Sequence, residues 1–290
     1  MTPVSSELSA RRPQAVTLLA RAHRRAITVL GPDRWASAAV AVTAVTGVSA
    51  TTPAAPHRGR DPWSGFADQF VLDVTSLRDE TDHAPTKELV TALYVVEAAA
   101  RVRVMSMALL GGHLLEVTPD GDAHDDADLR TLWIAYQDCA MTGDALDPLL
   151  TEVVRLRCAR THACRICSTL RLTDARDAGV DQSVTDQIDR YESSDQPERA
   201  KAVLRLTDAQ ISRPDLLDAD AVAQARAVLS AEECAELILD VAKWSTQKVN
   251  VATGTDGIDG IPLDDDGVAW LAFDDAGHPL PFRDRAQARS

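Results

Sequence analysis

Aromatic side chains are scarce in this sequence: Phe, Trp and Tyr together make up 4% of its 290 residues. A β-sandwich core usually relies on aromatic and β-branched residues, so this architecture is disfavoured. Ala, Leu and Val must fill the core instead, and these residues suit closely packed helices. We therefore expect an all-α protein, whose chain is long enough for one large domain or two small ones.

The sequence also lacks a long uninterrupted hydrophobic run. Its most apolar stretch, residues 36–50, is shorter than the roughly 20 residues that cross a bilayer and is rich in Ala and Thr. Cysteine is sparse as well, and five cysteines are an odd number in a chain far larger than a disulfide-stapled secreted domain. These features predict reduced thiols in a cytoplasmic protein with no membrane partner.

Positive charge is in short supply, since the formal net charge is -14. An acidic body repels phosphate backbones, so nucleic acid is not expected as a partner. Residues 1–60 are the exception, because eight arginines there outnumber two acidic residues. We interpret this basic leader as a solvated amphipathic helix followed by a loop.

Periodicity and turn residues divide the chain into four parts. These are the basic leader (1–60), a first helical unit (61–128), a second helical unit (129–255) and an acidic C-terminal extension (256–290). The C-terminal extension is expected to be solvated or packed on a neighbouring subunit, with a small hairpin near residues 268–273. Residues 89–104 resemble residues 236–251 in helical pattern, so the first unit is interpreted as a degenerate copy of the second.

Apolar positions at helical spacing, together with capping residues and glycines, predict the individual helices. In the first half they are expected over residues 11–30, 66–77 and 86–110. In the second half they are expected over 129–142, 147–161, 164–178, 181–193, 196–211, 218–228 and 231–252. Asp147 and Ser230 are predicted N-caps, and Ser230 forms a capping box with Glu233.

A Cys-x-x-Cys pair, Cys164 and Cys167, opens one of these predicted helices. At about 100° per residue the two side chains lie roughly 60° apart on one face, close enough for a disulfide. The positive end of the helix and the guanidinium groups of Arg165 and Arg171 favour the thiolate form. A redox-active pair of thiols is therefore our leading interpretation.

Thiol chemistry also needs a group that moves protons, which a guanidinium cannot do because it stays protonated. Glu152 lies on the preceding helix among apolar residues and is a candidate general base, unless it simply pairs with Arg155 or Arg157. His162 precedes the cysteine pair and titrates in the right range, although a capping or surface role is the alternative. The cysteines themselves could be idle, or form a zinc site with Cys158 and His162.

The segment that carries these residues, Asp147 to Val180 (DPLLTEVVRLRCARTHACRICSTLRLTDARDAGV), resembles the active-site region of the carboxymuconolactone decarboxylase and alkylhydroperoxidase D-like family. Redox members of that family carry a Glu, a Cys-x-x-Cys twelve residues further on, and commonly a His four residues beyond the second Cys. Glu152, Cys164 and Cys167 match this spacing. Arg171 departs from it, because it stands where the family's His is expected.

The resemblance covers about residues 146–254 and, in a fainter form, the first helical unit. It implies an all-α, alkylhydroperoxidase D-like helical bundle that assembles as a dimer, trimer or hexamer. It further implies that Cys167 attacks a peroxide and that Cys164 resolves the sulfenic acid as a disulfide. Glu152 would accept a proton, with His162 as a substitute for the missing family histidine.

The function implied is that of a cofactor-independent thiol peroxidase or disulfide reductase. Its partners would be a small hydroperoxide substrate and a dithiol electron donor. Two alternatives stay open. The first is a decarboxylase or isomerase of a ring lactone, which the same family contains, and the second is a non-catalytic redox-sensing or assembly protein.

Overall fold

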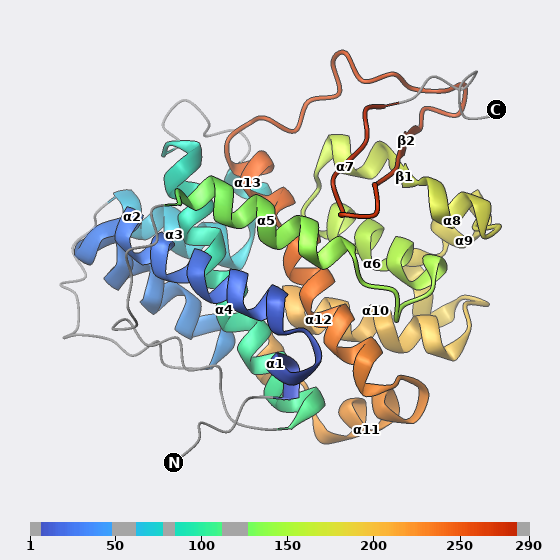
Figure 1. Cartoon of the computed structure of the whole chain (residues 1–290), viewed down its shortest axis with the longest axis horizontal. Helices are drawn as coiled ribbons and strands as arrows, with labels where there is room; N and C mark the ends of the chain where they lie inside the picture. Colours follow the sequence, from blue (N-terminus) through green and yellow to red (C-terminus); the bar gives the residue numbers. More distant parts are fainter. Residues whose placement is uncertain (1–6, 48–61, 78–84, 112–126, 283–290) are drawn as a thin grey trace.

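The computed structural model describes residues 7–47, 62–77, 85–111 and 127–282. Helices dominate these residues, and the only strands among them are two segments of three residues each (Figure 1). The prediction of an all-α protein is therefore confirmed. Among the described helices, none combines the length and the apolar content needed to cross a bilayer.

The first part of the chain builds a layer of helices that pack on one another. These are α1 (Glu7–Arg11), α2 (Pro13–Thr46), α3 (Pro62–Leu72) and α4 (Lys87–Leu110). Helix α2 packs along α4 and also contacts α3 and α5. Its residues Leu19, Ala22 and Leu30 are buried in the main hydrophobic core. The prediction of a solvated leader is wrong, because Ala and Leu at helical spacing give α2 a face that packs against α4.

The first helix was predicted to end at residue 30, and the structure shows a kink at Gly31 and Pro32 instead. Gly31 adopts φ 69° and ψ 172°, a backbone conformation that glycine reaches without steric cost. Pro32 then starts a second helical segment, a position where its missing N–H does no harm. The apolar stretch that follows is helical to Thr46 and buries Ala38, Val42 and Val45.

The second part of the chain supplies the remaining helices. They are α5 (Leu129–Met141), α6 (Pro148–Thr161), α7 (Arg165–Thr169), α8 (Thr173–Asp177), α9 (Gln182–Asp186), α10 (Glu198–Ile211), α11 (Ala219–Val228), α12 (Ala231–Trp244) and α13 (Gln247–Ala252), with 3-10 turns at Ile188–Ser193 and Pro214–Leu216. Asp147 caps α6 by accepting the N–H of Leu150. Ser230 and Glu233 form the predicted capping box of α12.

Three of the predicted helices are interrupted. The helix expected over 164–178 contains a strand, β1 (Leu170–Leu172), and those expected over 181–193 and 231–252 are each divided in two. Strand β1 is extended because it pairs in parallel with β2 (Ala269–Leu271) of the C-terminal extension, so tertiary pairing overrides local helix propensity. A small hairpin-like turn does form close to the predicted place, because Phe273 and Pro279 make an antiparallel bridge, but it follows β2 rather than covering residues 268–273. The described part of the extension packs on its own chain (Figure 1).

Helix α12 lies at the centre of the molecule. Its residues from Glu233 to Trp244 are all buried, and α4, α5, α6 and α10 contact it. Buried side chains of the surrounding helices donate hydrogen bonds to its backbone carbonyl groups. The pairs are Tyr94 with Ala242, Tyr136 with Leu239 (2.9 Å) and Gln210 with Ile238 (2.8 Å). The two segments that resemble each other in sequence thus lie in helices that touch.

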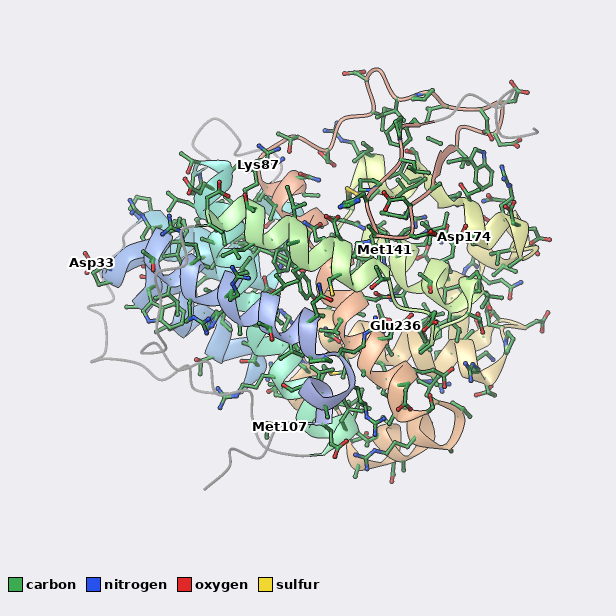
Figure 2. All side chains as sticks on the ribbon, viewed as in Figure 1. Asp33, Lys87, Met107, Met141, Asp174 and Glu236 are labelled. Carbon is green, nitrogen blue, oxygen red and sulfur yellow. A yellow bond between two sulfur atoms is a disulfide. The ribbon has the colours of Figure 1, made fainter. Side chains whose placement is uncertain are left out.

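Glu236 of α12 fixes the turn that leads from α5 into α6 (Figure 2). Its carboxylate accepts the N–H groups of Ala145 (2.9 Å) and Leu146 (3.2 Å) and lies 3.5 Å from the guanidinium of Arg12. Gly143 permits this close approach, because a Cβ atom there would lie 2.4 Å from the carboxyl carbon of Glu236. The start of α6 is therefore held against α12.

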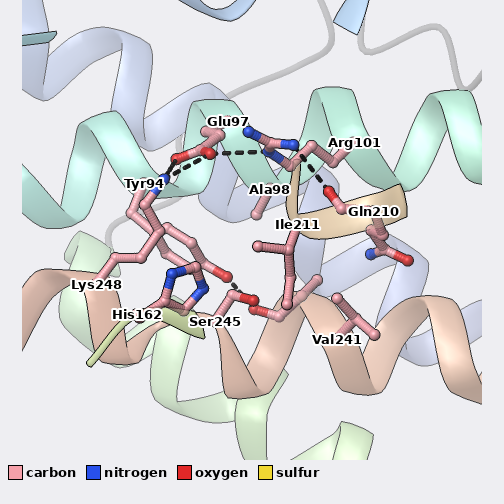
Figure 3. A pocket seen from close by; sticks show the side chains of 11 residues that line it. Tyr94, Glu97, Ala98, Arg101, His162, Gln210, Ile211, Val241, Ser245 and Lys248 are labelled. Atoms are coloured by element: carbon pink, nitrogen blue, oxygen red, sulfur yellow. Dashed lines mark hydrogen bonds and ion pairs between the residues drawn. The ribbon is translucent and has the colours of Figure 1, made fainter. Parts of the chain in front are cut away.

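A buried cluster of charges ties α4 to α13 (Figure 3). The carboxylate of Glu97 accepts hydrogen bonds from Lys248 (2.7 and 2.8 Å) and Arg101 (2.8 Å). Burial lowers the pKa of Lys248 to about 8, even though Glu97 acts in the opposite direction. The Arg101 guanidinium also donates to the carbonyl groups of Gln210 and Ser212. One carboxylate thus serves two buried cations.

Replacing Glu97 with Ala removes the anion that these two cations share. We expect Glu97→Ala to lower the free energy of unfolding by about 3–5 kcal/mol, because a buried charge is left uncompensated. Glu88→Ala is the control on the same helix, where an exposed carboxylate near the N-terminus contributes less than about 1 kcal/mol. Urea denaturation measures both variants, and equal losses would contradict the role of the cluster.

Candidate functional site

Cys164 and Cys167 form a disulfide in the structure, with their Cα atoms 5.3 Å apart. This separation lies within the usual range for a disulfide and confirms that the spacing brings the two side chains together. Cys164 is the N-cap residue of α7 and is fully buried, whereas Cys167 is 9% exposed. Cys167 is therefore the more accessible member of the pair.

A tight turn between α6 and α7 places Cys164. Helix α6 ends in a Schellman motif, in which the N–H of Cys164 donates to the carbonyl of Ala159 and that of Ala163 to Arg160. The left-handed position of this motif usually holds glycine, but here Ala163 adopts φ 51°. A non-glycine residue in that region costs of order 1 kcal/mol or more, so the surrounding contacts must hold the turn in place.

A buried ion pair on α6 holds the residues that follow this turn. Both side chains, Glu152 and Arg155, are 1% exposed, and the guanidinium donates to each carboxylate oxygen at 2.8 Å. Arg155 also donates to the carbonyl groups of Cys167 (2.9 Å) and Leu170, and the N–H of Leu172 points to the Glu152 carboxylate (3.4 Å). The pairing of Glu152 with Arg155, one of the two alternatives, is thus observed, and it anchors α7 and β1.

Glu152 also lines a cleft of about 760 Å³ between the segment from α7 to α9 and the C-terminal extension. Ser168, which follows Cys167, and Arg171 line the same cleft, as does Trp270 of β2, which pairs with Arg171. The cleft is large enough for a small organic molecule. Through it, a ligand can approach the residues that flank the cysteine pair.

The two arginines expected beside the thiols are engaged elsewhere. Arg171 lies in β1 rather than one helical turn beyond Cys167, so the prediction that it leans over a continuous helix is wrong. Its guanidinium donates to the carbonyl groups of Ser168 (2.7 Å) and Leu170 (2.8 Å), and burial lowers its pKa. Arg165 is 57% exposed and forms an ion pair with Asp256 (2.9 Å).

His162 is buried and faces a different cavity from Glu152. It lines a space of about 10 Å³ together with Tyr94, Ser245 and Lys248 (Figure 3). Burial, with a smaller contribution from Lys248, lowers its pKa well below the usual range, so the imidazole is neutral at pH 7. The structure therefore does not bring His162 and Glu152 into one site, and a relay through His162 stays a prediction.

Of the other three cysteines, Cys158 and Cys234 are buried and Cys139 is partly exposed. Burial raises the pKa of Cys158 to about 12 and also raises those of Cys139 and Cys234. Cys158 receives a weak hydrogen bond from Ser245 (3.7 Å). Within the described ranges, no group of three or more His, Cys, Asp or Glu side chains is arranged to hold a metal ion. The four ligands of the zinc alternative thus do not converge.

Two residues at the site were not singled out as functional from the sequence. Arg155 could have been found, because it stands three residues after Glu152 on the same helical face. Asp256 carries no comparable signal, since the extension contains many aspartates. Its carboxylate is fully buried and accepts the backbone N–H of Arg165 (3.0 Å).

Two curated proteins of Mycobacterium tuberculosis are similar to this chain: the uncharacterized protein Rv2313c of strain H37Rv and the uncharacterized protein MT2376 of strain CDC 1551. Each is 34% identical over 202 residues, which cover 66% of this chain and 71% of the relative. No protein-family model and no solved structure matches the sequence. The chain belongs to the same family as these two mycobacterial proteins.

Proposed function

We propose that this protein is a thiol oxidoreductase whose Cys164 and Cys167 alternate between dithiol and disulfide while they reduce small hydroperoxides. The observation that carries the proposal is the pair itself, which lies at bonding distance with Cys167 the more accessible. The raised pKa values of the three remaining thiols support it, because they leave this pair as the reactive one. The resemblance of residues 147–180 to the alkylhydroperoxidase D-like family points the same way.

The reaction balances without a cofactor. The Cys167 thiolate attacks the terminal oxygen of the hydroperoxide, the O–O bond breaks, and the departing alkoxide takes up a proton to become an alcohol. The resulting sulfenic acid is attacked by the sulfur of Cys164, which forms the S–S bond and releases hydroxide that is protonated to water. Two electrons pass from the thiols to the peroxide, and a dithiol donor restores them by thiol–disulfide exchange.

The ion pair on α6 supports a positioning role for Glu152. Both of its carboxylate oxygens accept hydrogen bonds from Arg155, which in turn holds the carbonyl of Cys167. Loss of the Glu152 carboxylate would leave the buried guanidinium of Arg155 without its anion, at a cost in stability. Glu152 thus keeps the turn that carries Cys167 in place, while its role as the proton acceptor stays a prediction.

The first test follows the thiols during reaction with peroxide. We expect stoichiometric hydrogen peroxide or an organic hydroperoxide to convert the reduced protein to the Cys164–Cys167 disulfide, detected by mass spectrometry as the loss of two hydrogen atoms. Cys164→Ser should stop at a sulfenic acid on Cys167. Cys167→Ser should consume peroxide at a rate that is lower than that of the parent by roughly a hundredfold or more. Cys234→Ser is the control and should react like the parent. Unchanged peroxide consumption by Cys167→Ser would rule out the proposal.

The second test separates positioning from proton transfer at Glu152. Glu152→Gln keeps the side-chain shape but leaves Arg155 without its anion, so we expect a loss of about 3–5 kcal/mol in unfolding free energy. Under a positioning role, disulfide formation should slow down by the same factor at every pH, because the segment that carries Cys167 loosens. A pH profile that lost its acidic limb, at unchanged stability, would instead identify Glu152 as the base.

The matched control for this variant is Glu192→Gln. Glu192 also forms a two-point ion pair, with Arg205 at 2.6 Å for both hydrogen bonds, but its side chain is 56% exposed. Exposed ion pairs contribute at most about 1 kcal/mol, so this variant should retain nearly all its stability and its full rate of disulfide formation.

A further inference from the structure

Asp256 is the first residue of the C-terminal extension, and it lies against the turn that holds the cysteine pair. Its side chain is fully buried. One carboxylate oxygen accepts the backbone N–H of Arg165 (3.0 Å), and the other accepts the guanidinium of the same residue (2.9 Å). Its backbone carbonyl accepts the N–H of Ile166 (3.1 Å). Asp256 therefore contacts both residues that stand between the two cysteines.

These contacts change the electrostatics expected from the sequence. The backbone N–H groups in the first turn of α7 were expected to stabilise a thiolate, yet two of them already bind Asp256. A carboxylate placed close to a thiol disfavours the negatively charged thiolate and raises the thiol pKa. Arg165 opposes this effect, because its positive charge is paired with the same carboxylate.

The remaining charges around the pair come from α6, β1 and the extension. They include Glu152, Arg155, Arg171 and Asp259, the last of which acts on Arg165 from a distance. Glu152 and Arg155 neutralise each other, and Arg171 is bound to two carbonyl groups. Arg155 binds the carbonyl of Cys167, whereas Asp256 is the carboxylate that binds a backbone N–H group in the first turn of α7.

We propose that Asp256 sets the redox poise of the Cys164–Cys167 pair by placing a buried negative charge beside the first turn of α7. The inference rests on the proposed thiol chemistry and assigns it a further positioning residue. A dithiol whose thiolate form is disfavoured is a stronger reductant, because stabilising the reduced form is what makes such pairs oxidising. Asp256 therefore favours the transfer of electrons from the pair to a substrate.

The same contact couples the C-terminal extension to the state of the cysteines. The extension holds the start of α7 through Asp256. It also holds β1, which follows α7, through the pairing with β2 and through a hydrogen bond from Thr173 to Leu271 (3.2 Å). Coupling between two events is reciprocal, so a thiolate that is disfavoured by Asp256 must weaken the docking of Asp256 to the same extent. The extension is bound more tightly when the pair is an uncharged disulfide.

The test compares two substitutions that act in opposite directions. Asp256→Asn removes the negative charge and keeps the side-chain shape, so the thiol pKa should fall and the equilibrium with glutathione should shift toward the dithiol by about threefold or more. Arg165→Gln removes the opposing positive charge and should raise the thiol pKa and shift the equilibrium toward the disulfide. The pKa is obtained from the pH dependence of iodoacetamide alkylation, and the equilibrium from mass analysis in glutathione buffers.

Asp264→Asn is the matched control, since it is the same substitution in the same extension. Asp264 accepts the N–H groups of Val268 and of the Trp270 indole, and the variant should leave the thiol pKa unchanged. If the role of Asp256 were purely structural, the thiol pKa would shift in the same direction in Asp256→Asn and in Arg165→Gln. That result, or no shift in either variant, would overturn the inference while peroxide-driven disulfide formation still stood.

The two hypotheses fail in distinguishable ways. Alkylation requires no peroxide, so thiol pKa shifts of opposite sign in the two variants support the electrostatic role of Asp256 whatever peroxide does. If peroxide fails to oxidise the pair, that failure overturns the peroxidase proposal alone. Should Asp256→Asn fail to fold, as judged by thermal unfolding, Arg165→Gln decides by itself. An unchanged or lowered thiol pKa in that variant would overturn the inference.

Discussion

The burial of helix α12 is the constraint on which the rest of the structure depends. A helix enclosed by other helices can carry ionisable side chains only if each finds partners, because charged groups lose their hydration. Glu233 completes the capping box and pairs with Arg199, while Glu236 binds two backbone N–H groups. Burial raises the pKa of Asp240 and lowers that of Lys243, so the interior disfavours charge on both.

The candidate site inherits its rigidity from this arrangement. Helix α6 packs on α12, and the buried side of α6 carries the Glu152–Arg155 pair that reaches the Cys167 carbonyl. The extension is tied to the same centre, because the ammonium group of Lys243 lies 3.8 Å from the Trp244 ring centroid and 4.4 Å from that of Phe273. The Lys243 side chain, packed against both rings, links the extension to α12, while β2 links it to β1, just beyond α7. One buried helix thus supports both sides of the site.

Features that depend on neighbouring residues were predictable from the sequence. Helical periodicity and the caps at Asp147 and Ser230 gave the starts of α6 and α12, and the spacing of Cys164 and Cys167 gave their proximity. Features that depend on distant partners were not. Strand β1 exists because it pairs with a segment about 100 residues later, and without that pairing the local sequence suggests a helix through Arg171. His162 is two residues from Cys164, yet it lines a small cavity whose lining does not include either cysteine of the pair.

The acidic composition of the extension predicted a solvated segment, and this prediction failed for a related reason. Aspartates lower mean hydropathy and suggest solvated chain, but several of them here organise local backbone: Asp264 binds the N–H groups of Asp266 and Val268, and Asp274 binds those of Ala276 and His278. Asp256 differs from them only in its surroundings, since it is fully buried and bonded to the residue after Cys164. Composition counts carboxylates without regard to burial, whereas the energy of a carboxylate depends on its burial and its partners. A residue counted among solvating charges is therefore a buried carboxylate bonded to the segment between the two cysteines.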